Sequence, residues 1–319
     1  MNNQSTGESA PIIDYLQERG LFTAVQSLEP LRNGASGAKV YRVIDQAGSY
    51  VVKHTHPSLC GGDQHLLSSY ERELRFYSVV DSGTFPAVPQ ALHVENNPEL
   101  GFILVLPNYE RIEFDQWSPK LQERAAELCA QIHSLDPACV ESLGLEFEEI
   151  TVDTDILDQA LENWIYVLNR HCQQLDTKPL QNIRDSMSSI CSILNAPPHR
   201  VCHGDFHAEN LLLNQGDLVI CDWQNVNIGK GAGDISFFIS RGKAAGIDID
   251  AAQLIDRYCE KLSFYTKQEV EKKDIYDVIN ASTVHISFRF WPHYLRDAKA
   301  DRVFQIYDAM VEAYLQLGL

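Results

Sequence analysis

Hydrophobic and polar residues follow two different spacings along the chain, and the change between them falls near residue 107. Before that point, short apolar runs are bounded by Gly and polar residues, which is typical of β-strands. Such runs cover residues 39–44, 49–53 and 101–106. A helical spacing interrupts them over about residues 66–80. Residues 1–107 are therefore predicted to form a small sheet-based part, with the first ten residues disordered.

After residue 107, apolar residues recur every three or four positions, which predicts helices. Ser118 and Pro119 mark one helix start, because Ser caps a helix N-terminus and Pro fits the first helical position. Further helices are predicted over residues 156–172, 180–194, 251–262 and 302–317. The pattern breaks at residues 200–221, where two short apolar runs flank a polar turn. This second part is thus predicted to be mainly helical, with one internal hairpin.

The overall charge of the chain argues against two classes of binding partner, nucleic acid and anionic membranes. The 319 residues include 26 Lys and Arg against 44 Asp and Glu, a formal charge of −18. Because binding to nucleic acid or to an anionic membrane needs a basic surface, we expect neither partner. No apolar run approaches the roughly 18 residues that a membrane span requires. The start of the chain lacks the basic and apolar regions of a secretory signal, and the eight cysteines are scattered without a CxxC pair. We therefore expect a cytoplasmic protein with reduced thiols.

The negative charge is concentrated after residue 107. Residues 1–107 carry 7 basic and 11 acidic residues, whereas residues 108–319 carry 19 and 33. A negative surface raises the local concentration of cations. The second part could therefore attract a cationic small molecule, and a merely solvated acidic surface explains the charge equally well.

The residues that could take part in chemistry are concentrated in the segment from Val201 to Asp222. Its sequence is VCHGDFHAENLLL, a turn and LVICD, and the residues WQ follow it. A hairpin brings its ends together, so Asn210 and Asp222 can share one cation. A small set of oxygen ligands suits Mg²⁺, which keeps water and phosphate oxygens in its shell. Asp205 would lie beside the metal without being needed as a ligand, free to accept a proton. A metal and a proton acceptor together are what phosphoryl transfer requires.

These motifs resemble the catalytic and metal-binding loops of the aminoglycoside phosphotransferase and choline kinase superfamily, which is related to the protein kinases. The HGDxHxxN and IxDWQ runs carry the likeness, and GKGAGD at residues 229–234 resembles the Gly-rich run that follows in these enzymes. A Gly after His203, where protein kinases usually have Arg, favours the branch that acts on small molecules. The DWQ and ExxFY runs are also similar to the ecdysteroid-kinase-like subgroup.

The resemblance implies an α+β, bilobal protein-kinase-like fold. Residues 1–107 would be the β-rich nucleotide-binding lobe, and residues 108–319 the mainly helical catalytic and substrate-binding lobe. The implied reaction transfers the γ-phosphate of ATP to a hydroxyl of a small molecule, aminoglycoside-like or choline-like. Asp205 would be the catalytic residue that accepts the hydroxyl proton, and Asn210 and Asp222 would hold Mg²⁺.

The same resemblance implies a lysine and a glutamate that position the nucleotide. Lys53 ends an apolar strand, as does the kinase lysine that holds the α- and β-phosphates. Glu73 would be its partner, since Glu71 lies two positions away on the predicted helix and points elsewhere.

Two loops would complete the nucleotide site. Gly34, Ser36 and Gly37 lie in the turn where a phosphate-covering loop belongs, and the two glycines would let backbone N–H groups approach the nucleotide. Leu106 and Asn108 would lie in the hinge over the adenine.

Three polar residues beside these motifs are assigned more loosely. His203 is interpreted as a buried histidine that supports the loop backbone rather than as an acid or base. His207 faces either the phosphates or the substrate. Asp234 is predicted to cap the helix that begins ISFF and to steady the catalytic loop.

An aromatic run at residues 288–294, FRFWPHY, has two interpretations. With Trp164 and Tyr166 it could form a wall for an apolar or quaternary-ammonium substrate, through the faces of the rings. Core packing is the simpler interpretation and is favoured.

Other functions stay open. A nucleotide-binding pseudokinase scaffold without catalysis would usually lack one of the key groups, and all five are present. A protein-directed kinase would show Arg before the catalytic Asp and an activation segment ending in APE, and the sequence has neither. A hydrophobic hydroxylated acceptor is suggested by the DWQ run and the aromatic run. The sequence does not indicate the oligomeric state.

Overall fold

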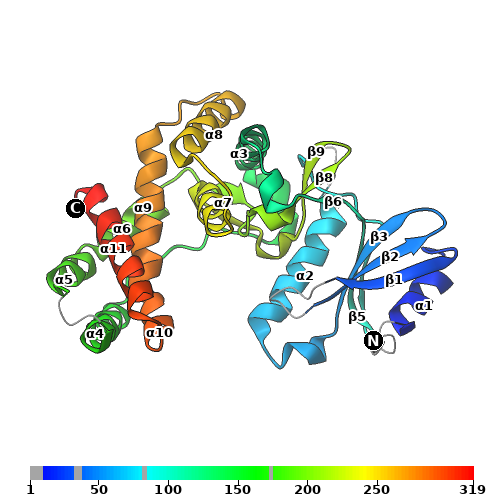
Figure 1. Ribbon diagram of the computed structural model, residues 1–319, viewed down its shortest axis with the longest axis horizontal. Coiled ribbons are helices and arrows are strands. Elements are labelled where there is room, and N and C mark those ends of the chain that lie inside the picture. The colour runs from blue at the N-terminus through cyan, green and yellow to red at the C-terminus, as the bar shows by residue number, and fades with distance from the viewer. Residues whose placement is uncertain (1–9, 32–37, 81–84, 172–174) are drawn as a thin grey trace.

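The structure, a computed structural model, describes residues 10–31, 38–80, 85–171 and 175–319. Disorder was expected for the first ten residues, of which 1–9 lie outside these ranges and Ala10 instead begins a helix. The turn with Gly34, Ser36 and Gly37 also lies outside the described ranges. The described residues form a part built on a β-sheet and a part built mainly of helices, which follow each other along the longest axis of the molecule (Figure 1).

Among the described residues, the first part contains a five-stranded antiparallel sheet with the strand order β1-β2-β3-β5-β4. In chain order its elements are α1 (Ala10–Glu18), β1 (Val25–Leu31), β2 (Lys39–Asp45), β3 (Ser49–Thr55), α2 (Gln64–Val79), β4 (His93–Asn97) and β5 (Gly101–Pro107). The three strands and the helix predicted from the apolar spacing are confirmed as β2, β3, β5 and α2.

Both faces of this sheet are covered, which explains why β5 is an unbroken apolar run. Ile103 and Val105 belong to a cluster that includes residues of α1, such as Leu16. Their neighbours Phe102 and Leu104 point to the other face and belong to the main core with residues of α2. A strand that is buried on both sides has no polar face, so it reads as a continuous hydrophobic run.

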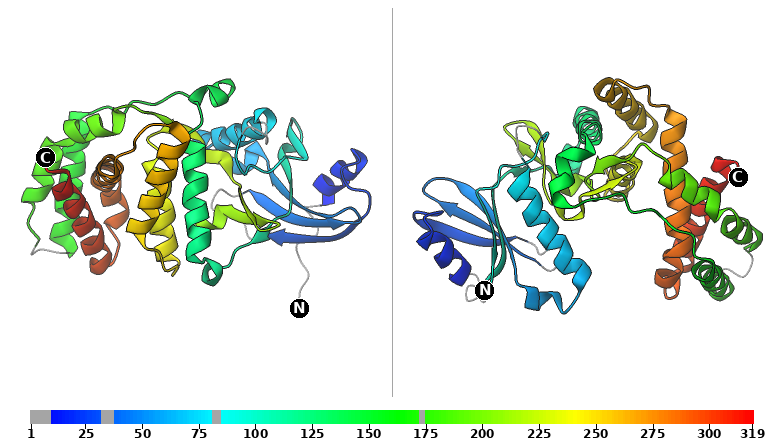
Figure 2. Two further views of the ribbon diagram at one scale, coloured as in Figure 1. Left: turned by 90° about the horizontal axis from the view of Figure 1, so that it is seen from above. Right: turned by 180° about the vertical axis from the view of Figure 1, so that it is seen from behind.

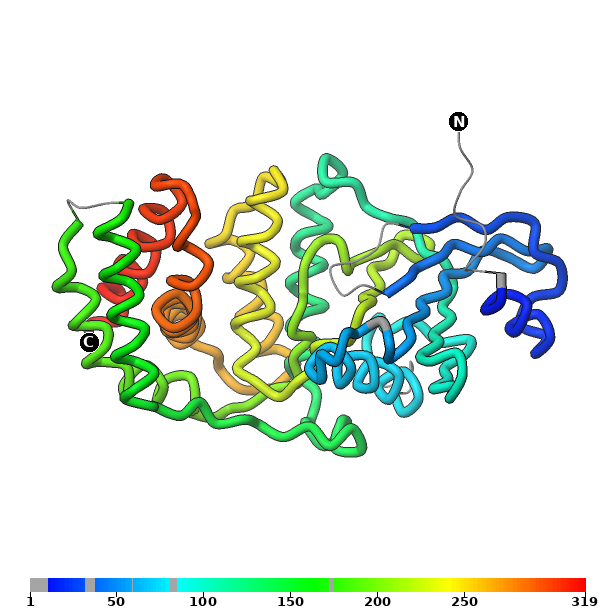
Figure 3. Tube along the Cα trace, turned by 90° about the horizontal axis from the view of Figure 1, so that it is seen from below, coloured from blue at the N-terminus to red at the C-terminus, as the bar shows by residue number. Residues whose placement is uncertain are grey.

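The helical part is larger, and its described residues include two small sheets, β10-β7 and β6-β8-β9. Its helices are α3 (Pro119–His133), α4 (Thr154–His171), α5 (Lys178–Asp185), α6 (Met187–Asn195), α7 (Ala232–Ala244), α8 (Ala251–Thr266), α9 (Lys272–Arg289), α10 (Trp291–Leu295) and α11 (Ala300–Leu317). Its strands are β6 (Glu110–Arg111), β7 (Arg200–Cys202), β8 (Leu211–Asn214), β9 (Asp217–Ile220) and β10 (Asn227–Gly229). Helices α3, α7 and α8 lie between the sheet and an outer group formed by α4, α5, α6, α9, α10 and α11 (Figures 2 and 3).

Two predictions in this part are confirmed in detail. Ser118 caps α3, and its side chain accepts a hydrogen bond from the backbone N–H of Leu121 at 3.4 Å. The hairpin is β8 and β9, which pair in antiparallel register from Leu211 with Ile220 to Asn214 with Asp217.

Three predictions about helices need correction. The expected helix at residues 180–194 is two helices, α5 and α6, which meet at Ser186, whose hydroxyl lies 3.0 Å from that of Tyr314. Helix α1 lies in a stretch expected to be β-rich, because nine residues offer too few turns for a helical spacing to be recognised. Helix α9 was not predicted. It packs against α4, α6, α7 and α11, so its apolar residues do not lie on one stripe.

Stacked aromatic rings connect the two parts. The ring of Trp223 lies parallel to that of Phe76 in α2, with centroids 4.3 Å apart and planes 13° apart. Phe85 meets the same indole edge-on at 5.2 Å. All three side chains are fully buried. Since Phe76 lies one helical turn after Glu73, this packing fixes the turn of α2 that carries Glu73.

None of the helices in the described ranges has both the length and the apolar composition that crossing a membrane requires.

The start of α2 provides a test of how this helix is held. The Asp63 side chain caps it by accepting a hydrogen bond from the backbone N–H of Leu66 at 3.1 Å. Replacing Asp63 by Ala should lower the free energy of unfolding by about 1 kcal/mol, whereas Asn keeps an accepting oxygen and should lose much less. Urea-induced unfolding followed by circular dichroism measures both. Equal stability of the Ala and Asn variants would contradict the cap.

Candidate active site

A buried lysine joins the sheet to the helical part. Lys53 lies near the end of β3, and its Nζ is 2.8 Å from Glu73 Oε2 and 2.9 Å from Asp222 Oδ1. Its side chain is only 16 % exposed and that of Glu73 only 4 %, whereas that of Asp222 is 38 % exposed. The pairing expected between Lys53 and Glu73 is present, and Glu71 is exposed on another face of α2. The ammonium therefore lies between one buried carboxylate and one that reaches solvent.

The two carboxylates determine the charge of this lysine. Burial alone lowers the pKa of a lysine, but Glu73 and Asp222 outweigh it, and the pKa of Lys53 is raised above its ordinary value. Lys53 thus stays cationic throughout the physiological range. A buried, permanently charged ammonium that is partly open to solvent through Asp222 is suited to bind a polyanion.

The loop that the sequence predicts to be catalytic, residues 203–210, begins after β7 and ends at the hairpin. Asn210 is the last residue of a single 3₁₀ turn, Ala208–Asn210, and its carbonyl accepts a hydrogen bond from the N–H of Cys221 at 2.9 Å. This bond brings Asn210 next to the chain that leads into Asp222. The Asn210 amide nitrogen donates to the Asp205 carbonyl at 2.9 Å and to Asp205 Oδ2 at 3.3 Å. The structure thus places the two predicted metal ligands beside each other, with Asp205 in contact with one of them.

The environment keeps the Asp205 carboxyl ionised. Burial raises the pKa of this group, but the neighbouring His207, His203 and Asn210 outweigh burial, and the pKa lies below its ordinary value. Asp205 is half-buried, so its carboxylate is accessible to solvent.

A second buried carboxylate, that of Asp234, holds the start of the loop through hydrogen bonds. Asp234 accepts hydrogen bonds from the backbone N–H groups of His203 at 2.7 Å and Gly204 at 2.9 Å. His133 Nε2 lies 3.1 Å from Asp234 Oδ2, and Tyr258 holds the other ring nitrogen at 2.8 Å. The prediction that Asp234 steadies the loop is confirmed. The predicted cap is wrong, because α7 begins at Ala232 and its N-cap is Gly231, which places Asp234 inside the first turn.

The same cluster does not form a metal site. His133, Cys202 and Asp234 bring possible ligand atoms within 4.8 Å of one another. Both oxygens of Asp234 are already engaged by hydrogen bonds, and burial raises the pKa of the Cys202 thiol well above its usual range. The cluster is therefore a hydrogen-bonded support.

The two histidines of the HGDxHxxN motif, His203 and His207, make different contacts. His203 is fully buried, accepts a hydrogen bond from the N–H of Asp205 at 3.2 Å and holds the Cys221 carbonyl at 3.0 Å. Burial lowers the pKa of its ring, so it is a neutral bridge between the loop and the hairpin, as interpreted from the sequence. His207 lies beside Asp205, with Nε2 3.6 Å from Oδ2.

Of the remaining residues predicted to bind the nucleotide, the structure describes Leu106 and Asn108. Leu106 is buried near the end of β5, and the backbone N–H of Asn108 donates to the Ser49 carbonyl at 3.0 Å, so both lie where the chain leaves the sheet. Gly34, Ser36 and Gly37 lie outside the described residues.

The aromatic run divides between core and surface. Phe288 and Trp164 are fully buried, and the Trp164 indole N–H donates to the carbonyls of Ser287 and Phe288. Core packing is thus confirmed for these two. Phe290, Tyr294 and Tyr166 are exposed.

The sequence interpretation assigned no function to two residues of the site. Gln224, the last residue of the DWQ run, has its amide nitrogen 3.4 Å from Glu73 Oε2 and so contacts the partner of Lys53. Its position in the DWQ run was the feature of the sequence that could have identified Gln224 as a site residue. His133 comes from α3, and nothing near it in the chain connects it to Asp234.

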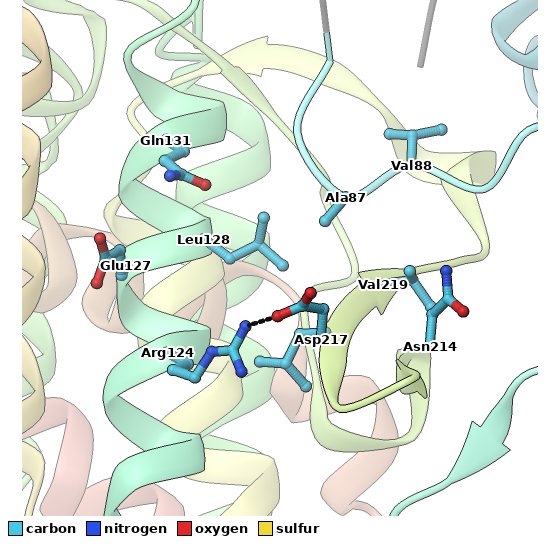
Figure 4. A pocket seen from close by; sticks show the side chains of 10 residues that line it. Ala87, Val88, Arg124, Glu127, Leu128, Gln131, Asn214, Asp217 and Val219 are labelled. Atoms are coloured by element: carbon cyan, nitrogen blue, oxygen red, sulfur yellow. Dashed lines mark hydrogen bonds and ion pairs between the residues drawn. The ribbon is translucent and has the colours of Figure 1, made fainter. Parts of the chain in front are cut away.

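A separate pocket of about 520 Å³ lies on the hairpin, away from these residues (Figure 4). Helix α3 and the turn of the hairpin form its walls, and Arg124 binds Asp217 across it at 2.5 Å. Its acidic residue Glu127 is paired with Arg257 and Lys261. The charged groups in this pocket are thus neutralised by one another.

The two-lobed fold is that of the protein-kinase-like phosphotransferases. The chain belongs to the phosphotransferase enzyme family, whose model matches residues 27–267. No curated protein matches the chain.

Solved structures of similar fold cover nearly the whole chain. An aminoglycoside 2'-phosphotransferase-IIIa mutant in complex with GDP is 14 % identical, with a TM-score of 0.59, over 96 % of this chain and 97 % of that one. ADP-bound aminoglycoside phosphotransferase APH(2'')-Ib is 16 % identical, with a TM-score of 0.56, over 97 % and 99 %. An ethanolamine kinase of Plasmodium vivax is 13 % identical, with a TM-score of 0.57, over 99 % and 89 %. At these identities the likeness establishes the fold.

Gly204 allows a direct test of how closely the loop is packed. Its φ is +79°, and a Cβ there would lie 2.1 Å from the Asn225 carbonyl oxygen. Gly204→Ala should therefore lower the free energy of unfolding by at least about 2 kcal/mol, because strain and a backbone clash combine. Gly216 has a φ of +91° with nothing within 4 Å of its Cβ position, so Gly216→Ala should cost only about 1 kcal/mol. Thermal unfolding compares the two, and equal losses would show that the close approach at Gly204 is not rigid.

Proposed function

We propose that this protein is an ATP-dependent kinase that transfers the γ-phosphoryl group to a hydroxyl of a small molecule. The observation that carries the proposal is the position of Lys53, whose Nζ contacts Glu73 and Asp222 at 2.8 and 2.9 Å. Lys53 and Asp222 are 169 residues apart in the chain and come from different lobes. Membership of the phosphotransferase family supports the reaction class.

In the proposed reaction, each group has one task. Lys53 holds the α- and β-phosphates with a charge that burial does not remove. Asp205 orients the acceptor hydroxyl and takes its proton as the oxygen attacks the γ-phosphorus and the bond to the β-phosphate oxygen breaks. Most of the rate comes from holding these groups in line, because phosphoryl transfer needs little further covalent chemistry from the protein.

The donor atoms near the phosphates fit Mg²⁺. The Asn210 amide nitrogen is engaged by Asp205, which leaves its oxygen for a cation. Asp222 accepts a hydrogen bond from Lys53 at Oδ1, and within the described residues its Oδ2 accepts none and is available to a cation. An amide oxygen and a carboxylate oxygen, with the rest of the shell open, are what Mg²⁺ uses alongside phosphate. When bound, Mg²⁺ would supply positive charge to the phosphate oxygens. Asn210 and Asp222 are the residues that would hold it.

ATP is proposed as the donor, and Leu106 and Asn108 as the chain beside its base. Structures of similar fold carry ADP in one case and GDP in another, so the likeness supports a purine nucleotide and does not separate the two. The phosphate-covering turn at Gly34, Ser36 and Gly37 remains a prediction.

For the acceptor, we propose a cationic molecule such as an amino sugar or an amino alcohol. Residues 108–319 carry most of the net negative charge of the chain. Similar folds include enzymes named for aminoglycosides and for ethanolamine, both of which carry amines.

Two of the three exposed rings, Phe290 and Tyr166, do not favour a cage for quaternary ammonium. Arg289 lies over Phe290 at 5.2 Å, and Arg296 lies over Tyr166 at 5.8 Å. One face of each ring is thus already covered by a cation of the protein itself, and a second cation nearby would be repelled. The charge of the helical lobe, rather than these rings, supports a cationic acceptor.

A reducing compartment such as the cytoplasm is part of the proposal. The seven cysteines in the described residues are free thiols, and five of them are buried. Such thiols are typical of proteins that are kept reduced.

Replacing Asp205 tests the reaction. Asp205→Asn should lower turnover by at least about 100-fold, because the carboxylate that takes the proton is lost. Nucleotide affinity should change little, since Asp205 does not contact Lys53 in the proposed arrangement. ADP release measures turnover, and titration calorimetry with a non-hydrolysable ATP analogue measures binding. Turnover near that of the unaltered protein would remove Asp205 from its assigned task.

An acceptor screen separates the remaining alternatives. We expect ADP release with Mg²⁺ and ATP to be stimulated by an aminoglycoside, choline or ethanolamine more than by a sterol-like hydroxylated compound or a protein mixture. Stimulation by the hydrophobic compound alone would overturn the cationic acceptor. ATP binding without phosphoryl transfer to any acceptor or to water would instead identify a pseudokinase scaffold.

A further inference from the structure

His207 lies at the catalytic loop with a defined orientation. It caps the 3₁₀ turn Ala208–Asn210, and its Nδ1 accepts a hydrogen bond from the backbone N–H of Glu209 at 3.3 Å. A ring nitrogen that accepts a hydrogen bond carries no proton in the neutral ring, so the ring proton lies on Nε2. That Nε2 faces Asp205 Oδ2 at 3.6 Å. The backbone thus selects the tautomer that directs an N–H at the Asp205 carboxylate.

The two oxygens of Asp205 are treated differently. Oδ2 receives the Asn210 amide at 3.3 Å and faces His207 Nε2. Within the described part of the chain, Oδ1 accepts no hydrogen bond, which leaves it as the oxygen that an acceptor hydroxyl can approach. A carboxylate that is bonded at one oxygen by an amide and faced there by a second N–H is restricted in its plane, which also restricts the direction of its second oxygen.

The surroundings of His207 restrict rotation of its ring. Its side chain is only 11 % exposed, and its ring meets Phe237 of α7 edge-on at 5.8 Å. Arg241 lies over the same Phe237 ring and pairs with Glu209 at 3.2 Å. These contacts link His207 and the 3₁₀ turn to α7.

We propose that His207 is a positioning residue for the phosphoryl transfer: its Nε2–H holds Asp205 Oδ2 so that Oδ1 faces the acceptor hydroxyl. The proposal rests on the proposed function and adds a task for His207, which the sequence motif leaves undecided between phosphates and substrate. The present separation of 3.6 Å is long for a hydrogen bond. Catalytic hydrogen bonds are often long without substrate and shorten when the reacting complex forms.

The kinetic test compares two variants that differ in one donor group. His207→Phe keeps a ring against Phe237 but has no N–H, whereas His207→Gln can place an amide N–H near the position of Nε2. With Mg²⁺, ATP and water as the acceptor, kcat of the Phe variant should fall about 10- to 100-fold, with the KM for ATP unchanged within about twofold. The Gln variant should recover most of kcat. His65→Phe, the same exchange at an exposed position in the first turn of α2, should leave kcat unchanged.

Two results would overturn the proposal. One is a Phe variant with kcat within about twofold of the unaltered protein. The other is equal losses in the Phe and Gln variants with raised KM, which would indicate that His207 only supports the fold. Thermal unfolding of each variant identifies one that fails to fold, in which case the Gln variant and the spectroscopic test below decide.

A spectroscopic test does not depend on turnover. Nitrogen-15 NMR of the histidine rings, with His207 assigned by its absence in His207→Gln, should show an unprotonated Nδ1 and a protonated Nε2. The Nε2 signal should shift in Asp205→Asn. A ring protonated on Nδ1 alone would overturn the proposal. If the unaltered protein shows the expected ring but releases no ADP with any acceptor, the proposed function fails while the contact itself stands.

Discussion

The burial of one ammonium group is the constraint on which the arrangement of this molecule depends. A cation withdrawn from water is costly unless opposite charges surround it, and Lys53 is surrounded by Glu73 from α2 and Asp222 from the end of the hairpin. These carboxylates come from different lobes, so neutralising Lys53 requires the lobes to meet. The stacked rings of Phe76 and Trp223 provide the apolar contact that holds them there. The electrostatic and hydrophobic contacts between the lobes therefore act at the same place.

The catalytic loop depends on a second buried charge of opposite sign. Asp234 accepts hydrogen bonds from the backbone N–H groups at the start of the loop, His133 holds Asp234, and Tyr258 in turn holds His133. Burial raises the pKa of the Asp234 carboxyl, but the hydrogen bonds from His133 and from the His203 backbone outweigh burial and lower it. The loop therefore rests on helices α3, α7 and α8, while Asp205 is presented at its surface. A half-buried carboxylate on a loop that is held by buried hydrogen bonds is suited to chemistry that depends on alignment.

Local patterns in the sequence were sufficient for the elements that carry the motifs. The hairpin, the cap at Ser118 and the helix with Glu73 follow from spacing within a dozen residues, and the structure contains them. Longer-range contacts were not accessible in this way. Helix α9 is surrounded by other helices, so it lacks the one-sided pattern that identifies a surface helix. The side-chain partner of Asp234, His133, comes from α3, and the partner of His133, Tyr258, comes from α8. The orientation of His207 depends on the backbone N–H of Glu209, which the composition of the sequence does not reveal.

The central claim is that Lys53, Asn210 and Asp222 converge on one triphosphate and its metal. A crystal structure with Mg²⁺ and a non-hydrolysable ATP analogue tests this most directly. We expect Lys53 Nζ to contact the α- or β-phosphate and the metal to bond to the Asn210 amide oxygen and an Asp222 carboxylate oxygen. A nucleotide seated elsewhere, or a metal held without Asn210 and Asp222, would contradict it.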